Sequence, residues 1–191
     1  LRTFFTWCEA HDHLARSPLA HLSKPHREKS RERVLTDDEL ARVWRASEEL
    51  GTFGKIVRLL ILTAQRKSEI AELHPSYFHD GLIIWPSSVT KNGREHTLPA
   101  SPAVHALAAE LAAIVAAKPF TTWSKPKIEL DRLSGVTDWT LHDLRRTTAT
   151  GMAKLGIAPH VVERILNHAS GTFAGVAGIY NRFRYVDEMR A

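Results

Sequence analysis

The chain has 191 residues, of which 43% are hydrophobic and 25% charged, an ordinary globular mixture with a formal net charge of +5. Its single cysteine, Cys8, excludes an internal disulfide and a multi-cysteine zinc site and favours a reducing compartment. The positive charge favours a polyanionic partner, and no apolar run approaches the roughly 20 residues of a membrane-spanning helix.

Residues 1–22 are predicted to be the last one or two helices of a preceding unit, because the chain begins without Met inside a helical pattern. Four of them are expected to form an apolar cluster: Phe4, Phe5, Trp7 and Cys8. Residues 23–35 are polar, mostly basic and contain a proline, which is typical of an interdomain linker. The alternative is a segment that lies along phosphates. The sequence therefore indicates a fragment of a longer protein.

A new domain, predicted to span 36–191, opens with a helix start signal. Thr36 and Glu39 have the spacing of a capping box, and the acidic first turn suits the helix dipole. Residues 54–64 are apolar on nearly all sides, so they are expected to form a buried helix. A short helix is predicted over 66–73.

The pattern changes over residues 77–98. The stretches "GLIIWP" and "HTLP" are typical of strands, and Asn-Gly in the intervening "KNGRE" is a strong hairpin signal. Helices are predicted to return over 101–117, 124–133, 141–155, 159–168, 172–180 and 183–190. Gly156 is expected to end one helix and Pro159 to begin the next. The predicted fold class is mainly α with a small antiparallel β-sheet (α+β).

The helix predicted over 141–155 places His142 and Arg145 on the same side, three residues apart. Thr140 and Asp143 form a second capping-box pattern, so His142 lies in a first turn whose free N–H groups favour an anion. The buried stripe is expected to comprise Leu144, Thr148, Met152 and Leu155. That leaves His142 and Arg145 beside the stripe, where either a carboxylate or a ligand phosphate would relieve their repulsion.

Four other candidates each have an ordinary structural explanation. Arg66 directly follows the apolar helix, and Glu69 is placed to hold its guanidinium, although a plain surface pair is equally consistent with the spacing. Lys91 lies at the predicted hairpin tip, where exposed lysines are common. His168 closes a helix and could act only as a partner of the helix dipole. Tyr180, in "AGIYNRF", could simply be a core residue.

Taken together, these residues resemble the motifs of the tyrosine recombinases, also called phage integrases. "TAQRKSEIAEL" is similar to the family's first-arginine motif, "TKNGREHTLP" to its hairpin lysine, "LHDLRRT" to its His-x-x-Arg motif and "LNH" to its second histidine. The family's positions are filled in order by Arg66, Glu69, Lys91, His142, Arg145, His168 and Tyr180. Each motif is weak alone, but the ordered set is specific and extends from about Thr36 to the end of the chain.

The resemblance implies a tyrosine recombinase catalytic domain over 36–191, preceded by the tail of a helical core-binding domain over 1–22. It implies a site-specific recombinase, or integrase, of a prophage or other mobile element such as a genomic island. Such an enzyme breaks and rejoins DNA through a covalent 3′-phosphotyrosyl intermediate, so that DNA is integrated or excised. Tyr180 is expected to be the nucleophile; Tyr185, five residues later, is the rival.

The chemistry of such a reaction needs a nucleophile, a base, an acid for the leaving 5′-oxygen and neutralisation of the phosphoryl oxygens. Arg66 and Arg145 supply planar forks suited to phosphate oxygens. A neutral His142 can accept the tyrosine proton or bond the phosphate, His168 can donate to another oxygen, and Lys91 can protonate the leaving oxygen. No metal and no other cofactor is expected, because the sequence has no His-Glu-x-x-His, acid cluster or phosphate-binding Gly loop.

Three alternatives stay open: a type IB topoisomerase-like enzyme, a non-catalytic DNA-binding module and a metal-dependent nuclease. The resemblance implies double-stranded DNA attachment sites as partners, a homotetramer on DNA in the full-length protein, and excision or DNA-bending accessory factors. The fragment alone is expected to be monomeric. No membrane partner is expected, and the predicted location is the bacterial cytoplasm, in association with the nucleoid.

Overall fold

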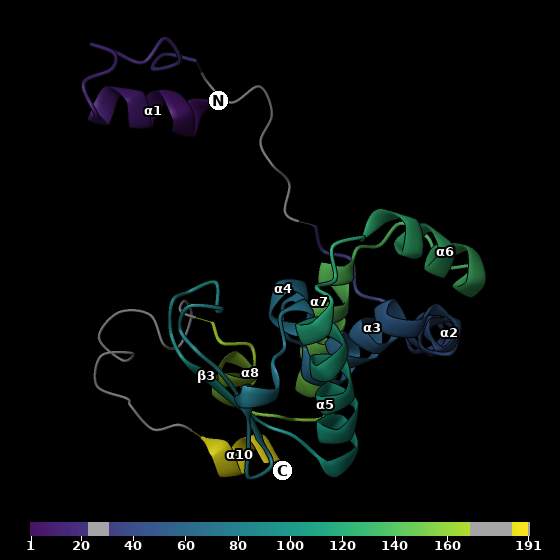
Figure 1. Cartoon of the computed structure of the whole chain (residues 1–191). Coiled ribbons are helices and arrows are strands. Elements are labelled where there is room, and N and C mark those ends of the chain that lie inside the picture. Colours follow the sequence, from purple (N-terminus) through teal and green to yellow (C-terminus); the bar gives the residue numbers. More distant parts are fainter. Residues whose placement is uncertain (23–30, 169–184, 191) are drawn as a thin grey trace. The chain divides into compact units, whose positions relative to one another are not determined.

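A computed structural model describes residues 1–22, 31–168 and 185–190. The chain divides into two compact units, Leu1–Glu32 and Arg33–Ala191 (Figure 1). The first contains α1 (Arg2–Ala10). The second contains α2 (Asp37–Ser47), a 3-10 turn (Glu48–Leu50), α3 (Gly51–Thr63), α4 (Lys67–Ala71), a second 3-10 turn (Pro75–Tyr77), β1 (Phe78–His79), β2 (Leu82–Trp85), β3 (His96–Pro99), α5 (Pro102–Ala117), α6 (Ser124–Ser134), α7 (Leu141–Lys154), α8 (Pro159–Ile165) and α10 (Val186–Arg190). Within the described ranges, no helix combines the length and apolar character needed to cross a bilayer.

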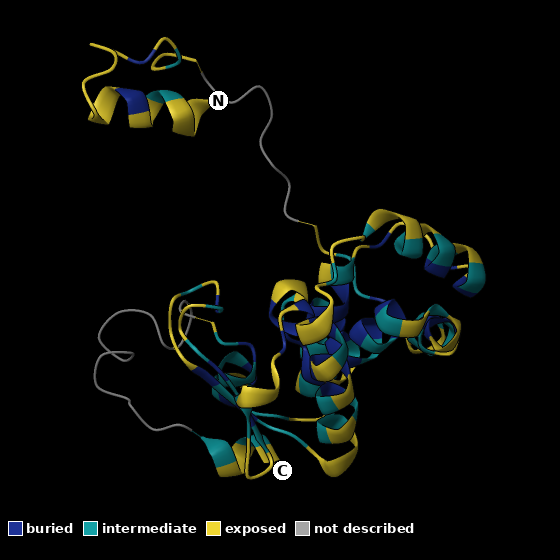
Figure 2. Ribbon diagram, in the orientation of Figure 1, coloured by how far each residue is buried: buried dark blue, intermediate teal, exposed yellow. Residues whose placement is uncertain are grey.

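The apolar cluster predicted in the first unit is largely exposed. Cys8 is the one buried member, whereas the exposed fractions of Phe4 and Trp7 are 58% and 48%. Phe4 and Phe5 contact each other edge to face, with ring centroids 5.4 Å apart. The predicted apolar cluster is not a packed core because, among residues 1–22, α1 has no second helix to cover its apolar side (Figure 2).

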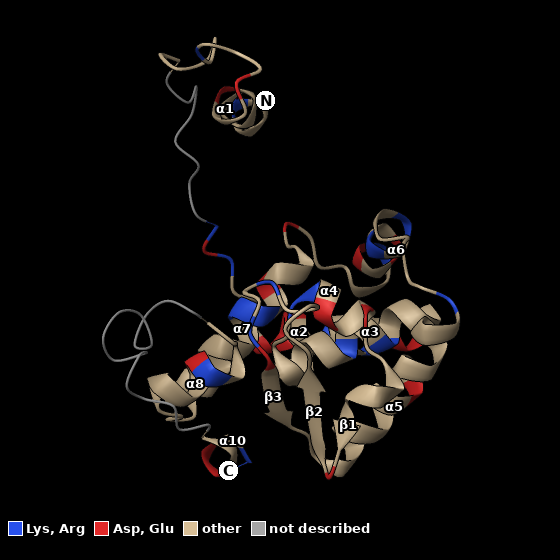
Figure 3. Ribbon diagram, turned by 60° about the vertical axis from the view of Figure 1, so that its left-hand side comes forward, with Lys and Arg blue, Asp and Glu red and all other residues tan. Residues whose placement is uncertain are grey.

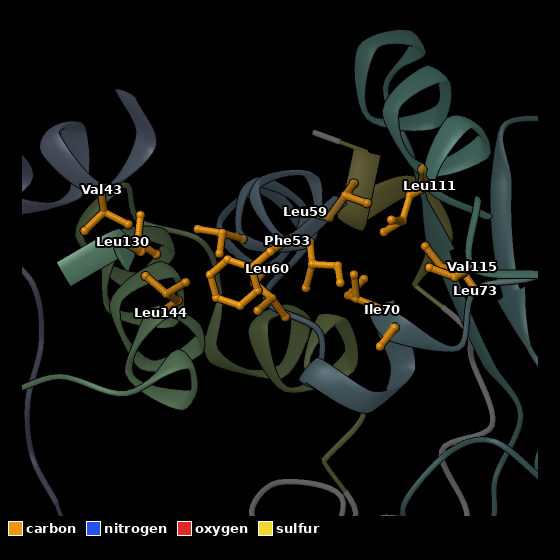
Figure 4. Close-up of a cluster of buried hydrophobic side chains, with 14 of the residues drawn as sticks. Val43, Phe53, Leu59, Leu60, Ile70, Leu73, Leu111, Val115, Leu130 and Leu144 are labelled. Carbon is orange, nitrogen blue, oxygen red and sulfur yellow. The ribbon is translucent and has the colours of Figure 1, made fainter. Parts of the chain in front are cut away.

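The second unit is built around α3, which packs against α2, α4, α5 and α7. Its side chains Phe53, Leu59 and Leu60 lie at the centre of the buried cluster in Figure 4. Gly54 permits the close approach of α2, since a Cβ at this position would lie 1.8 Å from the Ser47 carbonyl oxygen. The predicted buried helix is thus confirmed.

The predicted helix boundaries are confirmed at several local signals. The Thr36 N–H donates to the Glu39 carboxylate at 2.8 Å, and the Glu39 N–H donates to the Thr36 hydroxyl at 3.2 Å, which completes the capping box. Gly156, with φ +83°, follows the end of α7, and Pro159 is the first residue of α8. The helix predicted over 172–180 lies outside the described residues.

The sheet has the order β1-β2-β3 with antiparallel pairing, and the predicted hairpin is formed by β2 and β3. The ladder ends at the pair Trp85 and His96, so a loop of residues 86–95 joins the strands. The Gly93 N–H donates to the Thr90 carbonyl at 3.1 Å, and φ of Gly93 is +66°. Lys91 therefore lies at the centre of the turn, as predicted. The two-residue strand β1 was not predicted, because its pairing gives no local pattern.

Candidate active site

A cavity of about 230 Å³ lies where the α3–α4 turn, the β2–β3 loop and the start of α7 meet. Its lining comprises Gln65, Arg66, Lys67, Ser68, Lys91, Leu141, His142 and Arg145. Four of the predicted site residues, from three separate segments, are thus brought together. A larger cavity of about 440 Å³ lies between β3, the start of α5 and α10, but none of the predicted site residues lines it.

Arg66 is held by Glu69 at the start of α4. The guanidinium donates to the Glu69 carboxylate at 2.9 Å, and the Arg66 backbone N–H donates to the same carboxylate at 3.0 Å. Glu69 is only 1% exposed, and its backbone carbonyl accepts a bond from the Trp85 indole at 2.9 Å. The plain surface pair considered above is therefore wrong. One guanidinium N–H of Arg66 is bonded to the buried Glu69 carboxylate, and Arg66 also lines the cavity.

The side chain of Arg145 is more deeply buried than the sequence predicted. It is 4% exposed, and its guanidinium donates to the Ala64 carbonyl at 2.6 Å and to the Leu166 carbonyl. These carbonyls lie just after the last turns of α3 and α8, where free C=O groups attract a cation. The expectation that Arg145 lies beside the buried stripe was wrong, and Leu155, predicted within the stripe, is 83% exposed.

The two arginines lie close enough to influence each other. Burial, followed by the charge of Arg66, lowers the pKa of Arg145 to about 10, with Glu69 acting in the opposite direction. Arg145 therefore stays protonated at neutral pH. Lys67 and Lys91 also line the cavity, whereas Glu69 is the carboxylate in direct contact with Arg66. The cavity consequently has an excess of positive charge that an anion would balance; Figure 3 marks basic residues beside α4 and on α7.

The surroundings of the two candidate histidines, His142 and His168, lower the pKa of each. Partial burial, then the charges of Arg145 and Arg146, lowers the pKa of His142. Partial burial and the charge of Arg145 likewise lower the pKa of His168, which follows α8. Asp143 caps α7, because its carboxylate accepts the Thr140 backbone N–H at 2.8 Å. The lowered pKa of His142, in the first turn of α7, favours the neutral form that the pattern predicts.

Of the two candidate tyrosine nucleophiles, the structure describes one. Tyr180 lies outside the described residues. Tyr185 is described, and its ring lies 5.0 Å from His160 and 5.7 Å from the Arg164 guanidinium, both on α8. It is not among the residues that line the cavity. Among the described residues, no three His, Cys, Asp or Glu side chains gather closely enough to hold a metal ion.

Two residues of the site's support were missed by sequence reasoning. Gln65 is 1% exposed and donates from Nε2 to the carbonyls of Thr63, at 2.7 Å, and Ile165, at 2.8 Å. His96 is buried with its ring stacked on Trp85 at 5.5 Å. Burial, followed by the charges of Arg145 and Arg66, lowers the pKa of His96 to about 3. The only sequence signal for Gln65 or His96 was a polar residue where the pattern of the chain places a buried side chain.

Comparison with known proteins agrees with this geometry. A sequence model described as the phage integrase family matches residues 33–184. The fold is similar to that of lambda integrase in a dimer bound to a COC′ core site, with a TM-score of 0.67 and 21% identity over 94% of this chain and 56% of that one. It is also similar to XerA recombinase, with a TM-score of 0.59 and 22% identity over 99% of this chain and 71% of that one.

A third solved structure, the integrase from mycobacterium phage Brujita, has a TM-score of 0.56 and 18% identity over 98% of this chain and 67% of that one. Comparison with curated proteins gave no match. These structures share the fold of the tyrosine recombinase catalytic domain, which confirms the predicted fold class. The family match covers well over half of the sequence, so the chain belongs to the phage integrase family. It spans little more than half of the lambda integrase chain.

Proposed function

We propose that this chain is the catalytic part of a site-specific tyrosine recombinase that cleaves and rejoins DNA through a covalent 3′-phosphotyrosyl intermediate. The proposal rests on one observation: Arg66 and Arg145 line a single cavity together with Lys91 and His142, and Glu69 pairs with Arg66 there. A scissile phosphate in this cavity would receive planar donors from both arginines. Pre-positioned positive charge is the main requirement for phosphoryl transfer.

The reaction is a displacement at phosphorus in which Tyr180 is the nucleophile. The Tyr180 oxygen bonds to phosphorus while the bond from phosphorus to the 5′-oxygen breaks. His142, whose pKa is lowered by partial burial and by the charges of Arg145 and Arg146, accepts the tyrosine proton or bonds the phosphate, and His168 donates to a second phosphoryl oxygen. Lys91 gives a proton to the leaving 5′-oxygen. Attack by a 5′-hydroxyl reverses these steps, so rejoining needs neither ATP nor a metal.

The substrates and partners follow from the family and remain part of the proposal. Solved lambda integrase structures include a dimer bound to a COC′ core site and a tetramer bound to a Holliday junction. We infer that the full-length protein binds double-stranded attachment sites of a prophage or related element as a homotetramer, with excision or bending factors. Residues 1–22 would be the core-binding tail, 23–35 the linker and 36–191 the catalytic domain. The site of action would be the bacterial cytoplasm, at the nucleoid.

Covalent trapping tests the proposal. The chain, and a version extended at its N-terminus, would be incubated with nicked attachment-site DNA in EDTA, and any denaturant-resistant adduct would be mapped by peptide mass. We expect an adduct on Tyr180 that disappears in Tyr180→Phe and persists in the matched variant Tyr185→Phe. An adduct on Tyr185 would overturn the assignment of the nucleophile. DNA binding by the extended version without any adduct would favour a non-catalytic binding module.

A plasmid assay separates the remaining alternatives. Relaxation of supercoiled plasmid lacking an attachment site would indicate a type IB topoisomerase-like enzyme. Cleavage that EDTA abolishes would indicate a metal-dependent nuclease. Recombination between two attachment sites in EDTA is the result that the proposal predicts.

A further inference from the structure

The turn that follows α8 is connected to all three segments that line the cavity. Three consecutive backbone carbonyls, at the last residue of α8 and the two residues after it, each accept a side-chain donor. The acceptors are Ile165, Leu166 and Asn167, and the respective donors are Gln65, Arg145 and Asn92. His168 is the next residue. The position of His168 is therefore linked to the α3–α4 turn, to α7 and to the β2–β3 loop.

The link to the β2–β3 loop is a pair of amide side chains. Asn92 Nδ2 donates to the Asn167 carbonyl at 3.0 Å and to the Asn167 side-chain oxygen at 2.9 Å. Asn92 Oδ1 accepts from the Arg94 backbone N–H at 3.2 Å and from Asn167 Nδ2 at 3.4 Å. Both donor hydrogens and both acceptor lone pairs of Asn92 are thus used. Such complete pairing fixes the loop in one place at the residue directly after Lys91.

Asn167 occupies a backbone position that would suit glycine better. The His168 N–H donates to the Glu163 carbonyl at 3.1 Å and the Asn167 N–H to the Arg164 carbonyl at 3.0 Å, which is a Schellman motif. Asn167 has φ +49° in this motif. The end of α7 has the same pair of bonds, but Gly156 occupies the corresponding position with φ +83°. At the end of α8 the position is held by an asparagine, and the side chain that glycine would lack is the one that meets Asn92.

A neutral pair suits this location. Arg66 and Arg145 act electrostatically on His168, so a carboxylate used as a tether here would compete with a phosphate for the same cations. Two amides form several hydrogen bonds without adding charge. Lys91 itself is exposed, so the backbone of the loop determines where its ammonium group can reach.

We propose that Asn92 and Asn167 are positioning residues, whose paired amides hold the β2–β3 loop against the end of α8 so that Lys91 reaches the leaving 5′-oxygen beside His168. The proposal rests on the function proposed above at one point, the role of Lys91 as the acid. It assigns no contact with the substrate to either asparagine.

A substrate that needs no acid separates positioning of Lys91 from general structural support. A 5′-thiolate leaves without protonation, because a thiol has a pKa near 8.5 whereas a hydroxyl is nearer the value of about 15.7 for water. Cleavage would be measured on nicked duplexes with either oxygen or sulfur at the scissile 5′ position. The informative variants are Asn92→Ala and Asn167→Gly, since glycine keeps the positive φ and removes only the side chain. Ser88→Ala, an exposed change in the same loop, is the matched control.

We expect both asparagine variants to cleave the oxygen substrate about 10- to 100-fold more slowly, within the range of a general-acid contribution. On the sulfur substrate they should return to within about threefold of the parent chain, as Lys91→Ala should, whereas Arg66→Ala should not recover. The double variant should be no slower than either single variant, because both changes remove the same pair. Ser88→Ala should match the parent on both substrates.

The outcomes distinguish failure of the positioning role of the asparagines from failure of the acid role of Lys91. Recovery of Lys91→Ala on sulfur without recovery of the asparagine variants would overturn the positioning role alone, as would normal cleavage of the oxygen substrate by those variants. Failure of Lys91→Ala to recover would overturn the acid role of Lys91, and the positioning role with it. Thermal unfolding of each variant would show that Asn167→Gly keeps the fold.

Discussion

Arg145 and Lys91 line the same cavity, but the chain supports them in different ways. Arg145 is 4% exposed and is bonded to the carbonyl groups that follow two helices, α3 and α8. Lys91 is exposed at the centre of a turn, and the connection of its loop to α8 runs through Asn92 and Asn167. The charge of Arg145 is thus part of the folded core, whereas Lys91, the proposed proton donor, lies on an exposed loop. Stability and activity should therefore respond together at Arg145 and separately at Lys91.

The largest effect is expected for Arg145→Ala. The substitution leaves the Ala64 and Leu166 carbonyls without this donor, which should lower the free energy of unfolding by about 2–3 kcal/mol. It also removes a planar donor from the phosphate, so cleavage should fall by about 10²- to 10³-fold. Urea denaturation and single-turnover cleavage would measure the two effects. Unchanged stability would show that the bonds to the helix ends are unimportant.

A smaller and purely catalytic effect is expected for Lys91→Ala. Loss of a general acid should slow cleavage by about 10²-fold or more, while the free energy of unfolding stays within about 0.5 kcal/mol of the parent value. Binding to a DNA duplex should weaken only slightly, because one phosphate contact at most is lost. Fluorescence anisotropy would check the binding. A loss of stability as large as that of Arg145→Ala would remove the contrast between the two regions.

The smallest effect concerns His96, which is buried in β3 and is influenced by the charges of both arginines. Its pKa is about 3 in the folded chain and near 6.5 when unfolded, so the unfolded state takes up the proton first as the pH falls. Stability should therefore decline from pH 6.5 towards pH 3, with His96 contributing a loss of about 2 kcal/mol between pH 7 and pH 5. Urea denaturation at the two pH values would show a smaller loss for His96→Gln. Equal losses in both chains would argue against a buried neutral imidazole.

The fold could be predicted where its signals are local. Thr36 and Glu39 mark the start of α2, and Gly156 and Pro159 mark the boundary between α7 and α8, because a cap or a turn depends on neighbours a few residues away. The exposure of Trp7 could not be predicted, because amphipathic spacing indicates an apolar side without showing what covers it.

The candidate site was predicted as a set of residues but not as a structure. Arg66, Lys91, His142 and Arg145 were recognised from ordered motifs, and the cavity confirms that they lie together. Their roles in the reaction stay predictions, as do those of His168 and Tyr180. The supports of the site come from positions distant in sequence: Asn92 and Asn167 are 75 residues apart, and Arg145 and Ala64 are 81 apart. Residue spacing within one helix or hairpin cannot predict contacts over such sequence separations.

The most direct test of the central claim replaces the charge on the substrate instead of a charge on the protein. A methylphosphonate at the scissile position of nicked DNA lacks the negative non-bridging oxygen that Arg66 and Arg145 are proposed to neutralise. The parent chain and Arg145→Ala would be compared in single-turnover cleavage of the phosphate and methylphosphonate substrates. We predict that the deficit of Arg145→Ala, about 10²- to 10³-fold on the phosphate, shrinks to about tenfold or less on the methylphosphonate. An equal deficit on both substrates would contradict the claim that this cavity neutralises the scissile phosphate.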